Sequence, residues 1–275
     1  MVKVLHVLDI AGVPSILSFY HQNHGFGNSD LIYHEKNTFS SSISRFYQGR
    51  SFKKFRNLLL YGIFNSRKYD VIHIHGAETL IPVFKLTGKK IVLHYHGSDI
   101  RDPNKSKNKI RIKLRSMADL IVYNAKNMEP KIITSSNVRK EFLPNPIDTS
   151  HFINKNNHKS GKLSITSGNH DKIKTINAIK NIGETTIVDL DVQNIPYPMM
   201  PVFLSKYEMY IDIRIMPWGQ TLEELSTTAL QALSCGCKIY HNDKIIEKFP
   251  AEHSPQNVLS RLNGFYEEIL KRAFK

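Results

Sequence analysis

Short runs rich in β-branched residues alternate along this chain with longer amphipathic stretches, and this alternation limits the folds that the chain can adopt. In the first half, strands are predicted at 3–9, 30–34, 70–75, 90–96, 119–124 and 141–144. Helices are predicted between them, at 13–24, 52–64, 78–86, 107–117 and 125–133. Such alternation is typical of βαβ units that build a parallel sheet. The sequence therefore predicts an α/β fold.

The pattern is interrupted once, by a polar run at 153–162, and then starts again. Further strands are predicted at 163–167, 186–191, 209–213 and 238–241, with helices at 173–182, 199–206 and 226–234. We therefore predict two Rossmann-like domains, residues 1–152 and 153–275, whose parallel sheets face each other across a cleft. A last helix is predicted over 255–274, and packing of this helix on the first domain remains open.

The charge of the chain favours anionic partners. It has 38 Lys and Arg residues against 24 Asp and Glu residues, for a net charge of +14. Nucleotides, anionic lipid headgroups and nucleic acid all fit this charge, although no aromatic–basic nucleic-acid module is recognisable, which disfavours the last. No apolar run is long enough to span a membrane. His6 and Asp9 interrupt the first apolar run, so it is interpreted as a strand rather than a signal peptide, and a cytoplasmic location is predicted.

Candidate ligand-binding residues follow the predicted strands of the first half. In an open parallel sheet, ligands bind beyond the carboxyl ends of the strands. Gly12 follows the first strand, and His75 and His96 end the third and fourth strands. We interpret His75 and His96 as ligand-facing, and His73 and His94 as core residues that point the opposite way. In the second half, 168–170 (Gly-Asn-His) follow a strand in the same manner.

The helix predicted at 226–234 offers a phosphate site. Its first residues, Ser226, Thr227 and Thr228, lie where free N–H groups and the helix dipole favour an anion. Glu223 lies just before this end, where it can accept hydrogen bonds from sugar hydroxyls or simply interact favourably with the dipole. The two cysteines, Cys235 and Cys237, are too few to close a zinc site, and we interpret them as packing residues.

Five segments in order resemble the family 4 glycosyltransferases, which are retaining enzymes of the GT-B fold. The segments are Ala11-Gly12-Val13, the strand 69–75 (YDVIHIH), His96-Gly97-Ser98-Asp99, 143–148 (LPNPID) with Phe152, and 230–236 (LQALSCG). The resemblance implies an acceptor-side first domain and a second domain that binds a nucleotide sugar.

The resemblance also assigns roles to residues. It implies that Gly12 offers its amide to the donor, that His96 contacts the transferred sugar, and that Lys172 or Lys174 neutralises the diphosphate. Glu223 matches the first acid of the family's E-x7-E motif, whereas Gln231 replaces the second acid, which holds the ribose. A neutral amide forms weaker hydrogen bonds than a carboxylate, so this replacement is expected to weaken donor binding.

The sequence thus predicts a glycosyltransferase that moves a sugar from a nucleotide-diphosphate donor to a glycan or lipid-linked acceptor. No cofactor or metal is expected, because the helix end at Ser226, one or two lysines and the amide of Gly12 can stabilise the leaving diphosphate without one. The alternatives are a nucleotide-sugar epimerase and a nucleotide-sugar-binding protein with weak or no turnover. Basic residues around 58–61 and along 105–115 leave open a peripheral site on the inner membrane surface.

Overall fold

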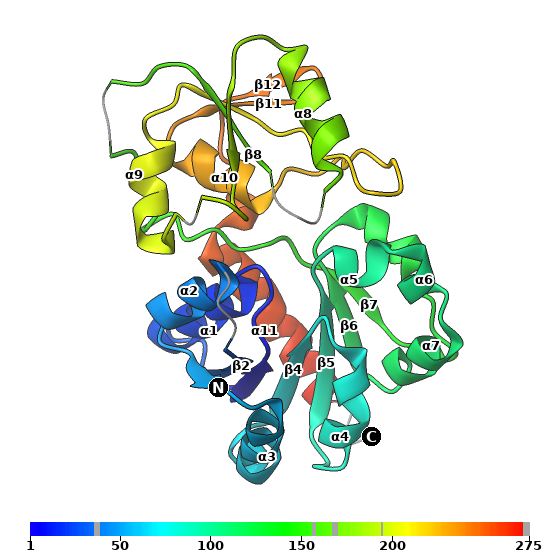
Figure 1. Ribbon diagram of the computed structural model, residues 1–275. Coiled ribbons are helices and arrows are strands. Elements are labelled where there is room, and N and C mark those ends of the chain that lie inside the picture. Colours follow the sequence, from blue (N-terminus) through cyan, green and yellow to red (C-terminus); the bar gives the residue numbers. More distant parts are fainter. Residues whose placement is uncertain (36–38, 156–157, 167–169, 194, 272–275) are drawn as a thin grey trace. The chain divides into compact units, whose positions relative to one another are not determined.

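The computed structural model of the protein describes residues 1–35, 39–155, 158–166, 170–193 and 195–271 (Figure 1). The chain forms two compact α/β units. The first contains Met1–Pro146 and Pro255–Lys275, and the second contains Ile147–Ser254. The division follows Pro146 rather than residue 152, because the chain from Ile147 onward already bonds within the second unit. The amide of Ile147 donates to the carbonyl of His253 at 2.9 Å, and Ser234 Oγ donates to the carbonyl of Phe152 at 2.5 Å.

The first unit contains a parallel sheet of seven strands in the order β3-β2-β1-β4-β5-β6-β7. Most of these strands are runs of Val, Ile and Leu, as expected where both faces of a parallel sheet are covered. Their aliphatic side chains form the centre of a continuous core with Tyr95, Phe84 and Met128. The strands are β1 (Val4–Val7), β2 (Ser29–His34), β3 (Arg50–Phe52), β4 (Val71–His75), β5 (Lys90–Tyr95), β6 (Leu120–Tyr123) and β7 (Lys140–Phe142).

The helices of the first unit connect these strands and cover the sheet (Figure 1). The bounds are α1 (Val13–Asn23), α2 (Phe39–Phe46), α3 (Phe55–Asn65), α4 (Ile81–Lys85), α5 (Ser98–Arg101), α6 (Pro103–Ser106) and α7 (Lys109–Arg115). Helix α7 begins at a cap in which Asn108 Oδ1 accepts from the amide of Arg111 at 3.1 Å. The single long helix predicted at 125–133 is instead a 3₁₀ segment, Lys126–Lys131, because Pro130 lacks the N–H that an α-helix needs.

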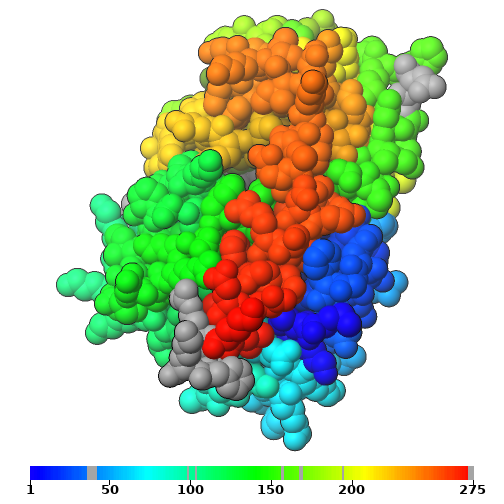
Figure 2. Space-filling model, turned by 180° about the vertical axis from the view of Figure 1, so that it is seen from behind, coloured from blue at the N-terminus to red at the C-terminus, as the bar shows by residue number. Residues whose placement is uncertain are grey.

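The last helix, α11 (Pro255–Lys271), belongs to the first unit, although the whole second unit precedes it in the chain. Figure 2 shows α11, in red, on the surface between the blue segment that contains α1 and the green segment that contains β7. Val258, Leu259 and Leu262 are buried on one side of this helix. Arg261 donates to the carbonyl of Phe142 at 2.8 Å, which ties α11 to β7. Residues 272–274 of the predicted helix lie outside the described residues.

The second unit contains five strands in the order β12-β11-β10-β8-β9. The strands are β8 (Lys162–Thr166), β9 (Thr186–Asp189), β10 (Met209–Ile211), β11 (Lys238–His241) and β12 (Lys244–Ile246), and the helices are α8 (Lys172–Lys180), α9 (Met200–Leu204) and α10 (Thr227–Ser234). Strand β12, which was not predicted, pairs antiparallel with β11. Asn242 and Asp243 both have positive φ angles at the turn between them, as a two-residue hairpin of type I′ requires.

The predicted α/β fold with two sheets is therefore confirmed, and the main differences are local. The predicted helix 52–64 begins later, at Phe55, because Arg50–Phe52 pairs with Ile32–His34 as an edge strand. Cys235 and Cys237 are buried free thiols, as packing residues should be. Among the described residues, no helix has the length and apolar character to cross a membrane.

Candidate functional site

Strand β1 ends in a tight turn that leads directly into α1. Leu8 and Ala11 have φ angles of 71° and 55°, and Gly12, at the N-terminus of α1, has a φ of 74°. Gly12 is buried, and a Cβ at this position would lie 2.6 Å from Cδ1 of Ile43 on α2. A side chain is therefore excluded both by the left-handed backbone and by the lack of space. Gly12 thus lies at the carboxyl edge of the first sheet, where a ligand was predicted.

Asp9 is held at the same turn by two hydroxyl groups. Its Oδ2 accepts from Ser15 Oγ at 2.6 Å and from Ser44 Oγ at 2.5 Å. Burial raises the pKa of Asp9 to about 6, although the hydrogen bonds from the two serines act in the opposite direction. The second oxygen, Oδ1, is buried and has no hydrogen-bond partner among the described residues. Sequence reasoning gave Asp9 no role, since Ser44 lies far away in the chain.

His96 follows β5 and is held by Asp99. The carboxylate of Asp99 accepts from the amide of His96 at 2.8 Å and from that of Gly97 at 2.7 Å. Asn124, after β6, donates to the carbonyl of His96 at 3.2 Å. These bonds position His96 at the carboxyl edge of the sheet. Burial lowers the pKa of His96 to about 3, so its imidazole is neutral.

The loop after β4 packs closely against residues 96–99, which we call the histidine loop. Gly76 has a φ of +65°, and a Cβ here would lie 2.2 Å from Cδ1 of Ile10 and 3.0 Å from Oδ2 of Asp99. Only glycine therefore lets the loops after β1, β4 and β5 meet. The structure thus brings Asp9 and Gly12, after β1, and His96, after β5, to the same edge of one sheet, with β4 between the two strands.

The prediction that His73 and His94 point away from His75 and His96 is wrong. Residues two positions apart in a strand share a face. The rings of His73 and His75 are stacked with their centroids 4.3 Å apart, and those of His94 and His96 are 4.2 Å apart. His75 also does not face a ligand at the surface, because it is fully buried. Its Nδ1 lies 2.9 Å from Nε2 of His96, so a hydrogen bond from the buried His75 ring helps to hold the His96 ring in place.

A buried ion pair supports the segment that follows the histidine loop. Glu78, after β4, is fully buried and accepts from Arg111 Nε at 2.6 Å. Arg115 is also fully buried, and one of its terminal nitrogens lies 3.4 Å from Glu78 Oε1. The same guanidinium donates to the carbonyl oxygens of Ser106 and Lys105 in α6. The predicted basic face along 105–115 is therefore partly internal.

In the second unit, the N-terminus of α10 is capped by its own chain. The Ser226 side chain accepts from the amide of Ala229 at 2.9 Å, and the amide of Ser226 donates to Asp212 Oδ2 at 2.8 Å. Arg214 lies 3.1 Å from the other oxygen of Asp212. The amides of Ser226 and Ala229 are thus already hydrogen-bonded within the chain. Thr227 and Thr228 form the first turn of α10 and are partly exposed.

Glu223 and Gln231 differ in their exposure. Glu223 has an exposed side chain, and its carbonyl lies 2.6 Å from Nε2 of His241. The other nitrogen of His241 lies 2.9 Å from the carbonyl of Asp212, so the histidine joins the segment before α10 to the end of β10. Gln231 is 95% buried on α10. Sequence reasoning missed the positioning role of His241, which no local pattern reveals.

Lys172 and Lys174 lie in the first turn of α8 and are paired differently. Lys172 Nζ lies 2.7 Å from Asp189 and 2.8 Å from Asp191, both at the carboxyl end of β9. Lys174 Nζ lies 3.3 Å from Asp171, the N-cap of α8, and 61% of its side chain is exposed. The neighbouring residues 168–169 lie outside the described residues.

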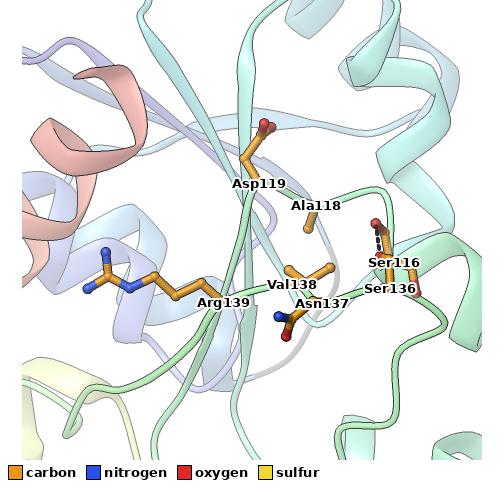
Figure 3. Close-up of a pocket in the computed structure, with 7 residues that line it drawn as sticks. All are labelled: Ser116, Ala118, Asp119, Ser136, Asn137, Val138 and Arg139. Atoms are coloured by element: carbon orange, nitrogen blue, oxygen red, sulfur yellow. Dashed lines mark hydrogen bonds between the residues drawn. The ribbon is translucent and has the colours of Figure 1, made fainter. Parts of the chain in front are cut away.

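Two of the surface hollows among the described residues lie in the first unit. One, of about 460 Å³, is lined by residues at the amino ends of β6 and β7, among them Asp119 and Arg139. Figure 3 shows Arg139 extending away from the other lining side chains. Asp119 is paired with Lys85 at 2.7 Å and with Lys90 at 3.3 Å. The second, of about 420 Å³, is lined from α1, β2 and the β3 region. The first hollow is thus at the opposite edge of the sheet from Gly12 and His96.

Part of the chain is similar in sequence to a known protein family. The profile described as Glycosyltransferase Family 4 matches residues 24–151, which include β2 through β7 and the histidine loop. Residues 24–151 are thus similar in sequence to the glycosyltransferases of family 4. The resemblance noted from the five motifs is thereby confirmed for the motifs between these residues. A search of curated protein sequences gave no match.

The fold is similar to that of several solved structures. HepE of Anabaena, crystallised in complex with UDP, aligns with a TM-score of 0.55 at 9% identity over 98% of this chain and 90% of its own. A glycosyltransferase from Rickettsia africae aligns with a TM-score of 0.55 at 9% identity over 98% of this chain and 99% of its own.

A third similar structure, a putative UDP-N-acetylglucosamine 2-epimerase from Listeria monocytogenes, aligns with a TM-score of 0.52 at 9% identity over 98% of this chain and 89% of its own. At such low identity these likenesses concern the fold alone, and the fold is GT-B.

Proposed function

We propose that this protein is a retaining glycosyltransferase that transfers a sugar from a nucleotide-diphosphate donor to a glycan or lipid-linked acceptor, without a metal ion at the diphosphate. The observation that carries the proposal is the histidine loop, in which a neutral His96 is fixed at the carboxyl edge of the sheet, within the segment similar to family 4. A neutral imidazole can donate a hydrogen bond to a sugar without adding a charge to its surroundings.

The transfer reaction requires stabilisation of a departing diphosphate, and the second unit offers groups for this task. Lys174 is the better candidate, because its ammonium group has one carboxylate neighbour at 3.3 Å, whereas Lys172 has two at shorter distances. Gly12 would offer its amide to the donor, and Thr227 and Thr228 in the first turn of α10 would contribute helix-end donors. Ser226 would instead hold this helix end in place, because its amide donates to Asp212 and its side chain caps Ala229. Glu223, whose carboxylate is exposed, would bind the donor sugar, and Gln231 the ribose.

Activity is best tested after the donor has been found by thermal shift with UDP, GDP, ADP and dTDP sugars, because a ligand of the folded state raises its stability. With that donor, His96→Ala and Lys174→Ala should each lower turnover at least about tenfold, as expected for lost transition-state contacts worth about 1.4 kcal/mol. Lys180→Ala, an exposed lysine in the last turn of the same helix, is the matched control and should retain turnover. Wild-type rates in both test variants would refute the proposed site.

An epimerase is the second candidate, favoured by the similarity to the Listeria protein noted above. It would convert the donor sugar in the absence of an acceptor. Incubation with donor alone, followed by product analysis, therefore distinguishes the two activities. A third outcome, nucleotide binding without hydrolysis, transfer or epimerisation, would indicate a binding protein and would agree with the replacement of the second motif acid by Gln231.

We also propose that the acceptor is reached at an anionic membrane surface, through α3. Three apolar side chains of this helix are exposed: Phe55 at 40%, Leu60 at 43% and Phe64 at 68%. Exposed basic residues flank them: Lys53, Lys54, Arg56, Arg67 and Lys68. Apolar side chains bordered by cations are typical of segments that lie in the headgroup region of anionic bilayers.

Flotation with vesicles tests this surface. Phe64→Ser with Lys68→Gln should lose binding to vesicles that contain anionic lipid, whereas Lys113→Gln on α7, another exposed lysine, should not. Equal binding of the wild-type protein to neutral and anionic vesicles would remove the electrostatic argument.

A further inference from the structure

Five histidines gather inside the first sheet, more than the proposed transfer reaction uses. They are His6 on β1, His73 and His75 on β4, and His94 and His96 on and after β5. The strand register explains the gathering, because His6 pairs with His73 and His75 pairs with His94 in adjacent strands. Side chains at paired positions lie side by side on one face of a sheet. His6, His73 and His75 are each fully buried.

The nitrogen atoms of these rings are poorly satisfied. The Nδ1 of His6 lies 3.0 Å from Nε2 of His75, so one of these two nitrogens donates a hydrogen bond to the other. Within the described part of the chain, Nε2 of His6, Nε2 of His73 and both nitrogens of His94 are buried without a hydrogen-bond partner. A polar atom that is buried without a partner destabilises the folded state, so several such atoms in one cluster need an explanation.

We propose that His6, His73 and His75 bind one zinc ion. Each offers a ring nitrogen, and these three nitrogens lie within 4.8 Å of one another. With Zn–N distances of about 2.0–2.1 Å and tetrahedral angles, ligand nitrogens are roughly 3.3 Å apart, close to the 3.0 Å between His6 and His75. Three histidines with a fourth position for water form a known kind of zinc coordination.

The surroundings of the three ligands fit this assignment. A histidine that binds a metal usually donates its other N–H to a partner that fixes its orientation. Nδ1 of His73 lies 2.6 Å from the hydroxyl of Tyr266 on α11, and Nδ1 of His75 lies 2.9 Å from Nε2 of His96.

A second group, His75, His94 and His96, also has nitrogens within 4.8 Å. It shares His75, so the two groups compete for one ring. We favour the first group because all three of its members are fully buried, whereas His96 is partly exposed. The proposed ion is separate from diphosphate chemistry, since a metal that bridges phosphates prefers oxygen ligands.

The site predicts one proton arrangement along the histidines. If Nε2 of His75 binds zinc, its Nδ1 carries the proton and donates to Nε2 of His96. The proton of a neutral His96 then lies on Nδ1, a buried atom with no partner among the residues that the structure describes. Neither the zinc ion nor this proton arrangement rests on the proposed function.

The test measures metal in protein purified through a tag without histidines. The wild-type chain should contain about one zinc per molecule by elemental analysis, as expected for a single three-histidine site. Removal of the zinc with a strong chelator should lower the melting temperature, and added Zn²⁺ should restore it. This comparison uses only the wild-type chain and therefore does not depend on the folding of any variant.

Variants then locate the site. His6→Gln and His73→Gln should each lose the zinc and the melting shift, whereas His24→Gln, a histidine with an exposed side chain, should keep both. His94→Gln should also keep the zinc. Wild-type protein without zinc and without a Zn²⁺-dependent melting shift would overturn the proposal. Loss of zinc in His94→Gln but not in His73→Gln would also overturn it, since the ion would then belong to the second group.

Discussion

Replacement of Glu78 by alanine should strongly destabilise the first unit. The carboxylate of Glu78 is fully buried and is the acidic partner of both Arg111 and Arg115, the second of which is itself fully buried. Removal of one partner of a buried ion pair typically costs 3–5 kcal/mol, because an uncompensated charge remains inside. The carbonyl oxygens of Ser106 and Lys105 still accept from Arg115, so we expect about 3 kcal/mol, the lower end of that range.

Urea unfolding, followed by two probes, measures this cost. Far-UV circular dichroism reports on both units, whereas the single tryptophan, Trp218, lies in the second unit. In Glu78→Ala, the part of the circular dichroism transition that belongs to the first unit should move to lower urea. The fluorescence transition of Trp218 should move less.

The control is Glu268→Ala on α11, since half of the Glu268 side chain is exposed and it pairs with Arg139. Exposed pairs contribute about 0–1 kcal/mol, so the control should unfold almost as the wild-type protein does. A double variant, Glu78→Leu with Arg115→Met, should be more stable than Glu78→Ala, because the fully buried charge of Arg115 is removed and only the partly exposed Arg111 loses its partner. Equal midpoints for Glu78→Ala and Glu268→Ala would refute the reasoning.

Three further outcomes are expected. Gly76→Ala should lower the free energy of unfolding by about 1–3 kcal/mol, measured by urea denaturation, because its φ is +65° and its Cβ would lie 2.2 Å from Ile10. Asp9 has a folded pKa of about 6 against its ordinary 3.8, so the folded state holds its proton more tightly, and this contribution to stability is lost as the pH rises from about 4 to 6. Asp9→Asn should therefore gain about 2–3 kcal/mol relative to the wild-type protein between pH 4 and pH 7.5, and a pH-independent difference would contradict this. Gln231→Glu should bind the preferred nucleoside diphosphate about 3- to 10-fold more tightly by calorimetry, because a carboxylate forms stronger hydrogen bonds to ribose hydroxyls, and unchanged affinity would remove Gln231 from the ribose site.

Sequence patterns identified the sheets well but not their edges. The central strands are apolar runs with few polar residues, so β1, β4, β5 and β6 were predicted almost at their observed bounds. Strands β3 and β12 were missed. Each is an edge strand of three residues that pairs with a single neighbour, although β7, an edge strand of the same length, was predicted. Helix α2 contains four serines, a residue that local patterns associate with loops, and it was also missed.

The candidate site was predictable where it depends on strand ends and not where it depends on distant partners. Gly12 and His96 lie at carboxyl ends, as parallel topology requires. Asp9 could not be recognised, because its partner Ser44 lies 35 residues away. The same holds for Glu78, which is bound by two arginines from a helix more than thirty residues later. The error about His73 and His94 arose from the side-chain alternation within strands, which places residues two apart on the same face.

The position of α11 in the chain has a consequence for biosynthesis. A ribosome must complete all of Ile147–Ser254 before the helix that contacts β7 and His73 exists. Until then, the face of the first sheet that α11 covers is exposed to solvent. His73, which contacts Tyr266 of α11 in the finished fold, lies on this face. A nascent chain that stalls within the second unit would therefore present an apolar surface suited to chaperone binding, and a fragment ending at Pro146 should aggregate rather than fold.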